Sequence, residues 1–302
     1  MEKSIITSLE EALLSADFDC KTFFDSINYK YHQTDHVSLY KYILLNKTDG
    51  KLLDETIRRI NSQKTKENLP DLIDFIIKPI DENKSNLKVL AIKTISNFKD
   101  TSSVEALMYC LNNKDSNYKI KLASAEALGK IGDKNAFDSL KGVVYDEDEK
   151  SVYVKESAVT ALGMLGDYRA LDVFESIINT KQMFLDKFSY LKEKIIEAMS
   201  KFDISKDKKA VEILKNSLLD NSPNVRISAI EAVMNSDIEA SYELIYDRLK
   251  YDDNIEVKKN ALVALYNISD RKILDEVIGG DFEKELKEYS KEIIKEYEEE
   301  ND

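Results

Sequence analysis

The two histidines are the residues whose type and spacing come closest to known metal chemistry. His32 and His36 stand four positions apart, which places both imidazoles on one face of a helix and lets them share a metal ion. A zinc protease would carry HExxH at this place, but Gln33, Thr34 and Asp35 supply no glutamate base. Two ligands without a third are typical of surface histidines, so we expect no metal here.

Signatures of other chemistries are missing from the sequence. Loops that cradle phosphates or dinucleotides need clustered glycines, and neither GxxxxGK[ST] nor GxGxxG occurs. The nucleophile elbow GxSxG does not occur either, and a Ser-His-Asp site would have to form within residues 31–37, where both histidines lie. We therefore predict no catalytic residue and no cofactor, and we do not expect an enzyme.

Composition and charge narrow the class of partner and the compartment. The chain has 302 residues with 57 acids against 44 bases, and the net charge of -13 disfavours nucleic acid because phosphate contacts depend on Lys and Arg. No stretch is apolar enough to span a membrane, and the start of the chain lacks the apolar core of a signal peptide. We therefore expect a cytoplasmic protein without a membrane partner, in which Cys20 and Cys110 stay reduced.

A sequence repeat determines the expected fold. Six segments align without a gap, and each opens with an apolar residue followed by a base. The segments are LKVLAIKTISNFKD, IKLASAEALGKIGD, VKESAVTALGMLGD, LKEKIIEAMSKFDI, VRISAIEAVMNSDI and VKKNALVALYNISD. Their bases are Lys88, Lys121, Lys155, Lys192, Arg226 and Lys258, separated by 33, 34, 37, 34 and 32 residues. A period of this length is typical of helical solenoids, and the scarcity of Gly and Pro agrees with long helices.

Each repeat contains two apolar-periodic stretches. In the aligned segments small or apolar residues recur three and six positions after the base, as at Ala158 and Ala161, on one face of a helix. A second stretch precedes each aligned segment, the first from Leu69 to Ile77. The sequence thus predicts an all-α, right-handed solenoid of about six antiparallel helix pairs over residues 69–268, followed by a partial unit.

An acid stands six positions before the base in every repeat. The six acids are Glu82, Asp115, Glu149, Asp186, Asp220 and Asp252. This position falls in the turn that enters the second helix, where a carboxylate can cap exposed backbone N–H groups and meet a basic side chain. We predict that these acids and bases form a structural ladder of polar contacts from unit to unit, in preference to a row of bases that contacts a ligand.

The period, the helix pairing, the acid-then-base spacing and the phrase ALGKIGD resemble the short bacterial and archaeal HEAT repeats, which also occur in phycobilin lyase subunits. The resemblance implies a non-enzymatic scaffold or adaptor that binds a protein, and it leaves open an accessory lyase or chaperone-like protein that acts on a cofactor-bearing partner. HEAT-like deoxyhypusine hydroxylases bind iron through His-Glu pairs, which this chain lacks. HEAT-like alkylpurine DNA glycosylases are disfavoured by the absence of tryptophan and by the acidic balance.

The repeat array of residues 69–280 is flanked by two different ends. Residues 1–68 miss the repeat register but show helical apolar spacing, so we expect an irregular helical cap. The alternative for this segment is a protein-binding surface, built by tyrosines around the histidines. These tyrosines are Tyr29, Tyr31, Tyr40 and Tyr42. Residues 281–302 hold ten acids and four lysines beside an apolar stripe, which predicts an acidic capping helix or tail. The stripe consists of Phe282, Leu286, Tyr289, Ile293 and Tyr297.

A partner would meet the second helices if they line the concave side, as in HEAT solenoids generally. The column five positions after the base should then project outward: Lys93, Glu126, Thr160, Glu197, Glu231 and Val263. A further column stands nine positions after the base: Asn97, Lys130, Met164, Lys201, Asn235 and Asn267. This polar surface suits an unidentified protein segment better than a phosphate backbone, while the alternative is an ordinary solvated face. The oligomeric state stays open.

Overall fold

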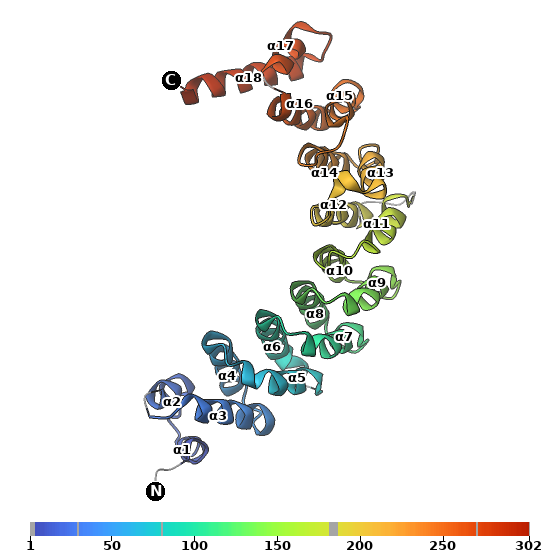
Figure 1. The fold of residues 1–302 in the computed structure, drawn as a ribbon. Coiled ribbons are helices and arrows are strands. Elements are labelled where there is room, and N and C mark those ends of the chain that lie inside the picture. Colours follow the sequence, from blue (N-terminus) through green and yellow to red (C-terminus); the bar gives the residue numbers. More distant parts are fainter. Residues whose placement is uncertain (1–3, 29, 80, 181–186, 270, 302) are drawn as a thin grey trace. The chain divides into compact units, whose positions relative to one another are not determined.

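In the computed structural model the chain folds into α-helices joined by short turns (Figure 1). The structure describes residues 4–28, 30–79, 81–180, 187–269 and 271–301, which contain eighteen α-helices and no β-strand. The α-helices are α1 (Ile5–Ala12), α2 (Cys20–Ile27), α3 (Gln33–Asn46), α4 (Gly50–Gln63), α5 (Leu69–Ile77), α6 (Ser85–Phe98), α7 (Val104–Asn112), α8 (Tyr118–Ile131), α9 (Phe137–Tyr145), α10 (Val152–Met164), α11 (Ala170–Ile178), α12 (Lys187–Met199), α13 (Lys208–Ser217), α14 (Pro223–Met234), α15 (Ser241–Tyr251), α16 (Ile255–Ser269), α17 (Lys272–Gly279) and α18 (Lys284–Asn301). Short 3-10 helices lie between them: η1 (Lys66–Asn68), η2 (Glu82–Lys84), η3 (Thr101–Ser103), η4 (Lys134–Ala136) and η5 (Ile204–Lys206). Among the described residues no helix has the length and apolarity that crossing a membrane requires.

The helix pairs expected from the repeat are present in the described part of the chain. They are α5/α6, α7/α8, α9/α10, α11/α12, α13/α14 and α15/α16. We call the member that comes earlier in the chain the first helix of its pair and the later member the second helix. The all-α fold built from these pairs confirms the prediction of an α-solenoid.

The chain divides into two compact units, unit 1 (residues 1–161) and unit 2 (residues 162–302). In unit 1 the first helices α5, α7 and α9 stack in one layer, and the second helices α6 and α8 pack side by side in the other (Figure 1). In unit 2 the first helices α11 and α13 pack together, and so do the second helices α12, α14 and α16 in sequence. Each unit is therefore a two-layer stack.

The core of each unit is determined by the repeat register. Residues three positions after the base have an exposure of 0% in all six repeats: Ala91, Ser124, Ala158, Ile195, Ala229 and Ala261. Residues seven positions after the base are buried as completely: Ile95, Leu128, Leu162, Met199, Val233 and Leu265. These two positions lie one helical turn apart, so they form one buried stripe on each second helix. The small residues in this stripe allow neighbouring helices to approach closely.

The acid at the end of a repeat caps the start of the next one. Asp100 Oδ1 accepts a hydrogen bond from the backbone N–H of Ser102 at 2.9 Å, and Asp133 Oδ1 accepts one from Asn135 at 2.9 Å. Gly132 ends α8 with a φ of 77°, a left-handed conformation that glycine adopts without steric cost. The corresponding Asp270 lies outside the described residues. The same short sequence thus ends one helix and begins the next.

The stack begins before residue 69. We expected an irregular cap over residues 1–68, and within it α3 and α4 pack on α5 and α6 and continue the two layers, while α1 and α2 pack on α3 and α4. The sequence hides this extra pair because Leu53 stands where α6 has Lys88, when the two 14-residue helices are aligned from their first residues. The packing of the repeats therefore continues in this pair without the base that marks the other repeats.

At the other end, α17 follows α16, and α18 packs on both of them. The expected apolar stripe of α18 faces these helices: Leu286 is completely buried, and Tyr289 and Ile293 are partly buried. Phe282 just before α18 is also partly buried, and the side chain of Tyr297 lies outside the described residues. The acids of α18 remain on its outer side, as in Glu288 and Glu292, which are exposed.

Substitution of two glycines by alanine would test how closely neighbouring helices approach. A Cβ atom at Gly163 in α10 would lie 2.8 Å from Ala198 Cβ and 2.9 Å from the Ala198 carbonyl oxygen, whereas a Cβ at Gly142 in α9 would meet nothing within 4 Å. We expect Gly163→Ala to lower the free energy of unfolding by about 1–3 kcal/mol through overpacking. Gly142→Ala should raise it by about 0.5–1 kcal/mol, because alanine favours the helix more than glycine does. Urea denaturation followed by circular dichroism measures both, and equal midpoints for the two variants would contradict the close approach.

Candidate functional site

The bases of the repeats pair with acids of the following repeat. Lys121 Nζ lies 2.8 Å from Glu149 Oε2 in unit 1. In unit 2 Lys192 Nζ lies 2.6 Å from Asp220 Oδ2. These side chains are largely buried, with exposed fractions between 9% and 15%. The repeat register predicted which residues take part, and the structure shows that each of these bases contacts the acid of the following repeat.

Arg226 and Asp252 form the most buried of these contacts. Arg226 Nε and Nη2 donate to the two carboxylate oxygens of Asp252 at 2.9 and 2.7 Å, and the side chains are 8% and 1% exposed. Arg226 Nη1 also donates to the carbonyl oxygen of Asp220 at 2.8 Å. The guanidinium therefore joins the turn of its own repeat to the turn of the next one in a bidentate geometry that lysine cannot reproduce.

The same acids cap the second helices that follow them. Glu149 accepts a hydrogen bond from the backbone N–H of Ser151 at 2.9 Å, and Asp220 accepts one from Ser222 at 2.9 Å. Asp252 accepts one from the backbone N–H of Asn254 at 3.0 Å. Each of these carboxylates thus satisfies a backbone group of its own turn and a base of the preceding repeat.

The last base has its acid in the capping segment. Lys258 is paired with Glu283, just before α18, and this contact holds the pKa of the Glu283 carboxyl below its ordinary value. Sequence reasoning missed Glu283 because it belongs to no repeat. Its separation of 25 residues from Lys258 is nevertheless close to the 28 residues between Lys192 and Asp220, so the spacing was a usable signal.

Lys88 and Asp115, two members of the expected ladder, are not brought together. Lys88 and Asp115 form no ion pair, as judged in the described residues, and Asp115 is exposed. Lys88 is half-buried, and burial lowers the pKa of its amine. Asp186, the acid that follows Lys155, and the side chain of Glu82 lie outside the described residues. The ladder contacts that the structure describes are therefore those of Lys121, Lys192, Arg226 and Lys258.

The column five positions after the base is exposed in most repeats. Lys93, Glu126, Thr160, Glu197 and Glu231 are exposed, and Val263 is partly buried. The column nine positions after the base is exposed in all six repeats: Asn97, Lys130, Met164, Lys201, Asn235 and Asn267. Two of these side chains contact residues outside the columns: Lys194 Nζ lies 2.6 Å from Glu197 Oε2, and Asn97 donates to Asn61 Oδ1 at 2.8 Å.

A third exposed column was missed by sequence reasoning. It stands two positions before the base and comprises Asn86, Lys119, Tyr153, Tyr190, Asn224 and Glu256, all exposed. The three columns are seven and four residues apart along each second helix, so they fall within one stripe at 3.6 residues per turn. The residue just before each aligned segment carried this signal, because two positions before the base lies on the same helical face as five positions after it. We call these three columns the outer stripe.

The outer stripe has opposite charge in the two units. In unit 1 its charged members are three lysines and one glutamate: Lys93, Lys119, Lys130 and Glu126. In unit 2 they are one lysine and three glutamates: Lys201, Glu197, Glu231 and Glu256. Such a surface can attract protein segments of either sign, but it offers no positive track of the kind that a phosphate backbone requires.

The described tyrosines near the two histidines take part in contacts within the N-terminal cap. Tyr40 is completely buried and donates to Gln63 Oε1 at 2.8 Å, and burial raises the pKa of Tyr40 to about 12. Tyr42 donates to Glu10 Oε1 at 2.9 Å, and the Tyr31 hydroxyl lies 2.9 Å from Ser8 Oγ. Tyr29 lies outside the described residues. These contacts favour a structural role for the three described tyrosines, and the alternative interpretation of this segment as a contact surface stays a prediction.

The two histidines do not converge on a metal. His36 is 6% exposed and packs beside the Tyr40 ring, with 6.1 Å between ring centroids. His32 is exposed where α3 begins, and its backbone N–H donates to Asp35 Oδ2 at 3.0 Å. Within the described ranges no group of three metal-binding side chains gathers at any place.

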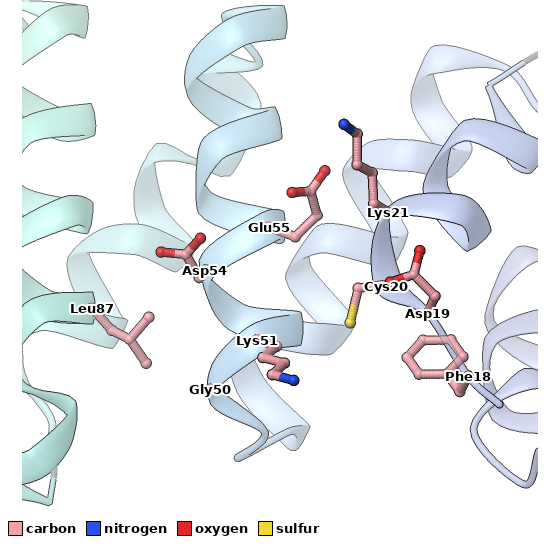
Figure 2. Close-up of a pocket in the computed structure, with 9 residues that line it drawn as sticks. All are labelled: Phe18, Asp19, Cys20, Lys21, Gly50, Lys51, Asp54, Glu55 and Leu87. Atoms are coloured by element: carbon pink, nitrogen blue, oxygen red, sulfur yellow. The ribbon is translucent and has the colours of Figure 1, made fainter. Parts of the chain in front are cut away.

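An open depression of about 440 Å³ lies where α2, α4 and α6 meet (Figure 2). Cys20 and Lys51 line it together with acids, and Leu87 contributes from α6. Partial burial, aided by the charges of Asp49 and Asp19, raises the pKa of the Cys20 thiol, so the reactive thiolate is disfavoured. Asp19 is used to cap α2 by accepting from the Thr22 N–H at 2.8 Å. This depression therefore has the features of a surface hollow between helix ends.

Both cysteines are free thiols. Cys110 is buried, its Sγ donates to the carbonyl oxygen of Ile76 at 3.5 Å, and burial raises its pKa to about 11. Burial thus raises the pKa of both thiols, which disfavours the nucleophilic thiolate at either cysteine. The most extended feature of the described surface is the repeated set of exposed residues on the second helices.

Part of the chain matches a known repeat family. Residues 69–153 and 114–183 match the family model of HEAT repeats, so this part of the chain consists of HEAT repeats. No curated protein matches the sequence. Among solved structures, the chain is similar to the complex of CpcE and CpcF of phycocyanin lyase from Nostoc sp. PCC7120, with 19% identity over 74% of this chain and 85% of that chain and a TM-score of 0.44. It is also similar to human deoxyhypusine hydroxylase in complex with glycerol, with 17% identity over 87% of this chain and 96% of that chain and a TM-score of 0.36.

The buried Arg226–Asp252 pair generates a stability prediction. Asp252→Ala leaves a guanidinium buried without its carboxylate, so we expect the free energy of unfolding to fall by about 3–5 kcal/mol. Asp253 contacts the same guanidinium at 2.9 Å but is 93% exposed, so Asp253→Ala should cost less than about 1 kcal/mol. Chemical denaturation of both variants makes the comparison. Equal losses would show that Asp252 adds nothing beyond a surface charge.

The buried His36 predicts a pH dependence of stability. Burial is the main cause that lowers the pKa of His36 below 6.5, with the charge of Arg59 acting in the same direction and that of Asp35 opposing it. The unfolded chain therefore binds a proton at higher pH than the folded chain, and stability falls as pH decreases through 6.5. His36→Gln should flatten the melting temperature between about pH 8 and pH 5, and His32→Gln should leave the slope unchanged. The same slope in both variants would contradict the assignment.

Proposed function

We propose that the chain is a non-enzymatic scaffold or adaptor whose outer stripe binds a segment of a partner protein. One observation carries the proposal: nearly the same three positions of every second helix are exposed. The position three after the base is buried in the core, and the base itself is partly or largely buried. A surface that repeats in this way suits an extended partner, because each repeat can make an equivalent contact.

The chemistry of the stripe in unit 2 indicates the kind of segment that would bind there. Glu197, Glu231 and Glu256 outnumber Lys201, and the amides Asn224, Asn235 and Asn267 can donate and accept hydrogen bonds beside them. A segment that carries lysine or arginine together with backbone polar groups fits this combination. Complementary charge of this kind determines binding specificity and the association rate more than it determines the affinity.

The proposal is tested by affinity capture of the tagged chain from lysate of its native host, followed by mass spectrometry. The stripe variant is Glu197→Lys with Glu231→Lys. The control is Glu212→Lys with Asp247→Lys, which reverses two exposed acids on the first helices α13 and α15 of the same unit. We expect one stoichiometric partner on the wild-type and control chains and its loss, by about tenfold or more, on the stripe variant, since two reversed pairs each cost several-fold.

The thermal unfolding of both variants serves as the folding control. Retention of the partner by the stripe variant, or equal loss from both variants, would contradict the proposed contact surface. The absorbance spectrum of the same eluate distinguishes the alternative role of an accessory lyase or chaperone-like protein. Absorbance above the protein band would show that the retained partner bears a cofactor.

A further inference from the structure

Unit 1 exposes a group of tyrosines, of which Tyr153 alone belongs to the outer stripe. All four tyrosines of its repeats are exposed: Tyr109 54%, Tyr118 48%, Tyr145 47% and Tyr153 66%. The described tyrosines of the N-terminal cap behave differently, because Tyr40 is buried and Tyr31 and Tyr42 are partly buried with their hydroxyl groups in hydrogen bonds. Exposed aromatic side chains are enriched where proteins bind proteins.

Three of these tyrosines lie along one edge of unit 1. Tyr118 begins α8, Tyr145 ends α9 and Tyr153 is the second residue of α10, so they flank the two turns 113–117 and 146–151. The turns are neighbours, since Lys114 Nζ in one lies 3.6 Å from Asp148 Oδ2 in the other. The contact between Lys121 and Glu149 joins the same two repeats at 2.8 Å. We call the three tyrosines and residues 146–149 the turn edge.

The acids of the turn edge divide into structural and outward-facing members. Asp146 accepts a hydrogen bond from the Asp148 N–H at 2.9 Å, and Glu149 is held by Lys121 and by the Ser151 N–H. Glu147 is exposed, and the Asp148 side chain is 85% exposed. The contact of Asp148 with Lys114 is long and joins two highly exposed groups, so a competing cation can replace it at little cost.

We propose that the turn edge binds an extended, arginine-bearing segment of a partner protein. A guanidinium can lie flat on a tyrosine ring and donate two parallel hydrogen bonds to a carboxylate, which matches tyrosines placed beside Glu147 and Asp148. A lysine ammonium is held more strongly by water and cannot make the paired contact. An apolar helix would leave the two carboxylates without partners, and a nucleic acid would meet negative charge. The turn edge shares Tyr153 with the outer stripe, but its acids and its other two tyrosines lie outside that stripe, so the two surfaces can be tested separately.

The test uses ¹⁹F NMR of the full chain labelled with 3-fluorotyrosine, with each resonance assigned by a Tyr→Phe variant. The probe is a peptide of alternating arginine and glycine, and a lysine–glycine peptide of the same length is the comparison. We expect the resonances of Tyr118, Tyr145 and Tyr153 to shift during the titration. The arginine peptide should bind about two- to fivefold more tightly than the lysine peptide, which is the size of a cation–π contribution at an exposed site.

A matched pair of variants separates this site from the attraction of an acidic chain for any cation. Glu147→Gln with Asp148→Asn removes the outward-facing acids and should weaken arginine-peptide binding by about fivefold or more. Glu105→Gln with Asp138→Asn removes the same charge from the opposite ends of α7 and α9, where both residues are exposed, and should leave binding nearly unchanged. Equal weakening in both variants, shifts of equal size at Tyr251 and Tyr289 in unit 2, or no preference for arginine over lysine would each overturn the proposal.

Discussion

A buried base that needs a carboxylate from the next repeat is the constraint on which this structure depends. Arg226 shows it most clearly, since the carboxylate of Asp252 that neutralises it comes from the following turn and is 1% exposed. A buried charge without its partner is costly, so a repeat is stable only when its neighbour is in place. The last repeat obeys the same rule, because Glu283 of the capping segment supplies the acid for Lys258. The C-terminal capping segment thus closes the stack with an ion pair to Lys258 as well as with the apolar stripe of α18.

This constraint also decides which surface is left for a partner. On each second helix one stripe is buried in the core, and on four of them, among the described residues, the base near the start of the helix contacts an acid of the next repeat or of the capping segment. The positions that take part in neither contact are those of the outer stripe, and their residue types vary from repeat to repeat while their exposure hardly varies. The stabilising contacts and the variable exposed residues thus lie on different faces of each second helix, so substitutions in the outer stripe should leave the stack unaltered.

The sequence predicted what is local and periodic and missed what depends on packing between distant segments. Helix pairs and the buried stripe follow from a 3.6-residue period repeated at about 34 residues, and the described pairs lie where the sequence placed them. The burial of Tyr40 and His36 could not be foreseen, because it results from helices α2 and α4 packing around α3. The pair α3/α4 escaped notice for a related reason: Leu53 replaces the base, so the repeat signature is absent although the packing continues. The pairing of each base with its acid likewise depends on how neighbouring repeats stack. The assignment of the exposed columns to partner binding remains a prediction.

Site-specific photocrosslinking in the native host would test the central claim, that the outer stripe contacts a partner protein, most directly. A benzophenone amino acid is placed at Thr160 or Glu231 on the stripe, and at Asp138 or Asp247 on the first helices of the same units, all of them exposed positions. The account predicts a discrete crosslinked protein from at least one stripe position and none from the first helices. Crosslinks from the first helices alone, or the same products from all four positions, would contradict it.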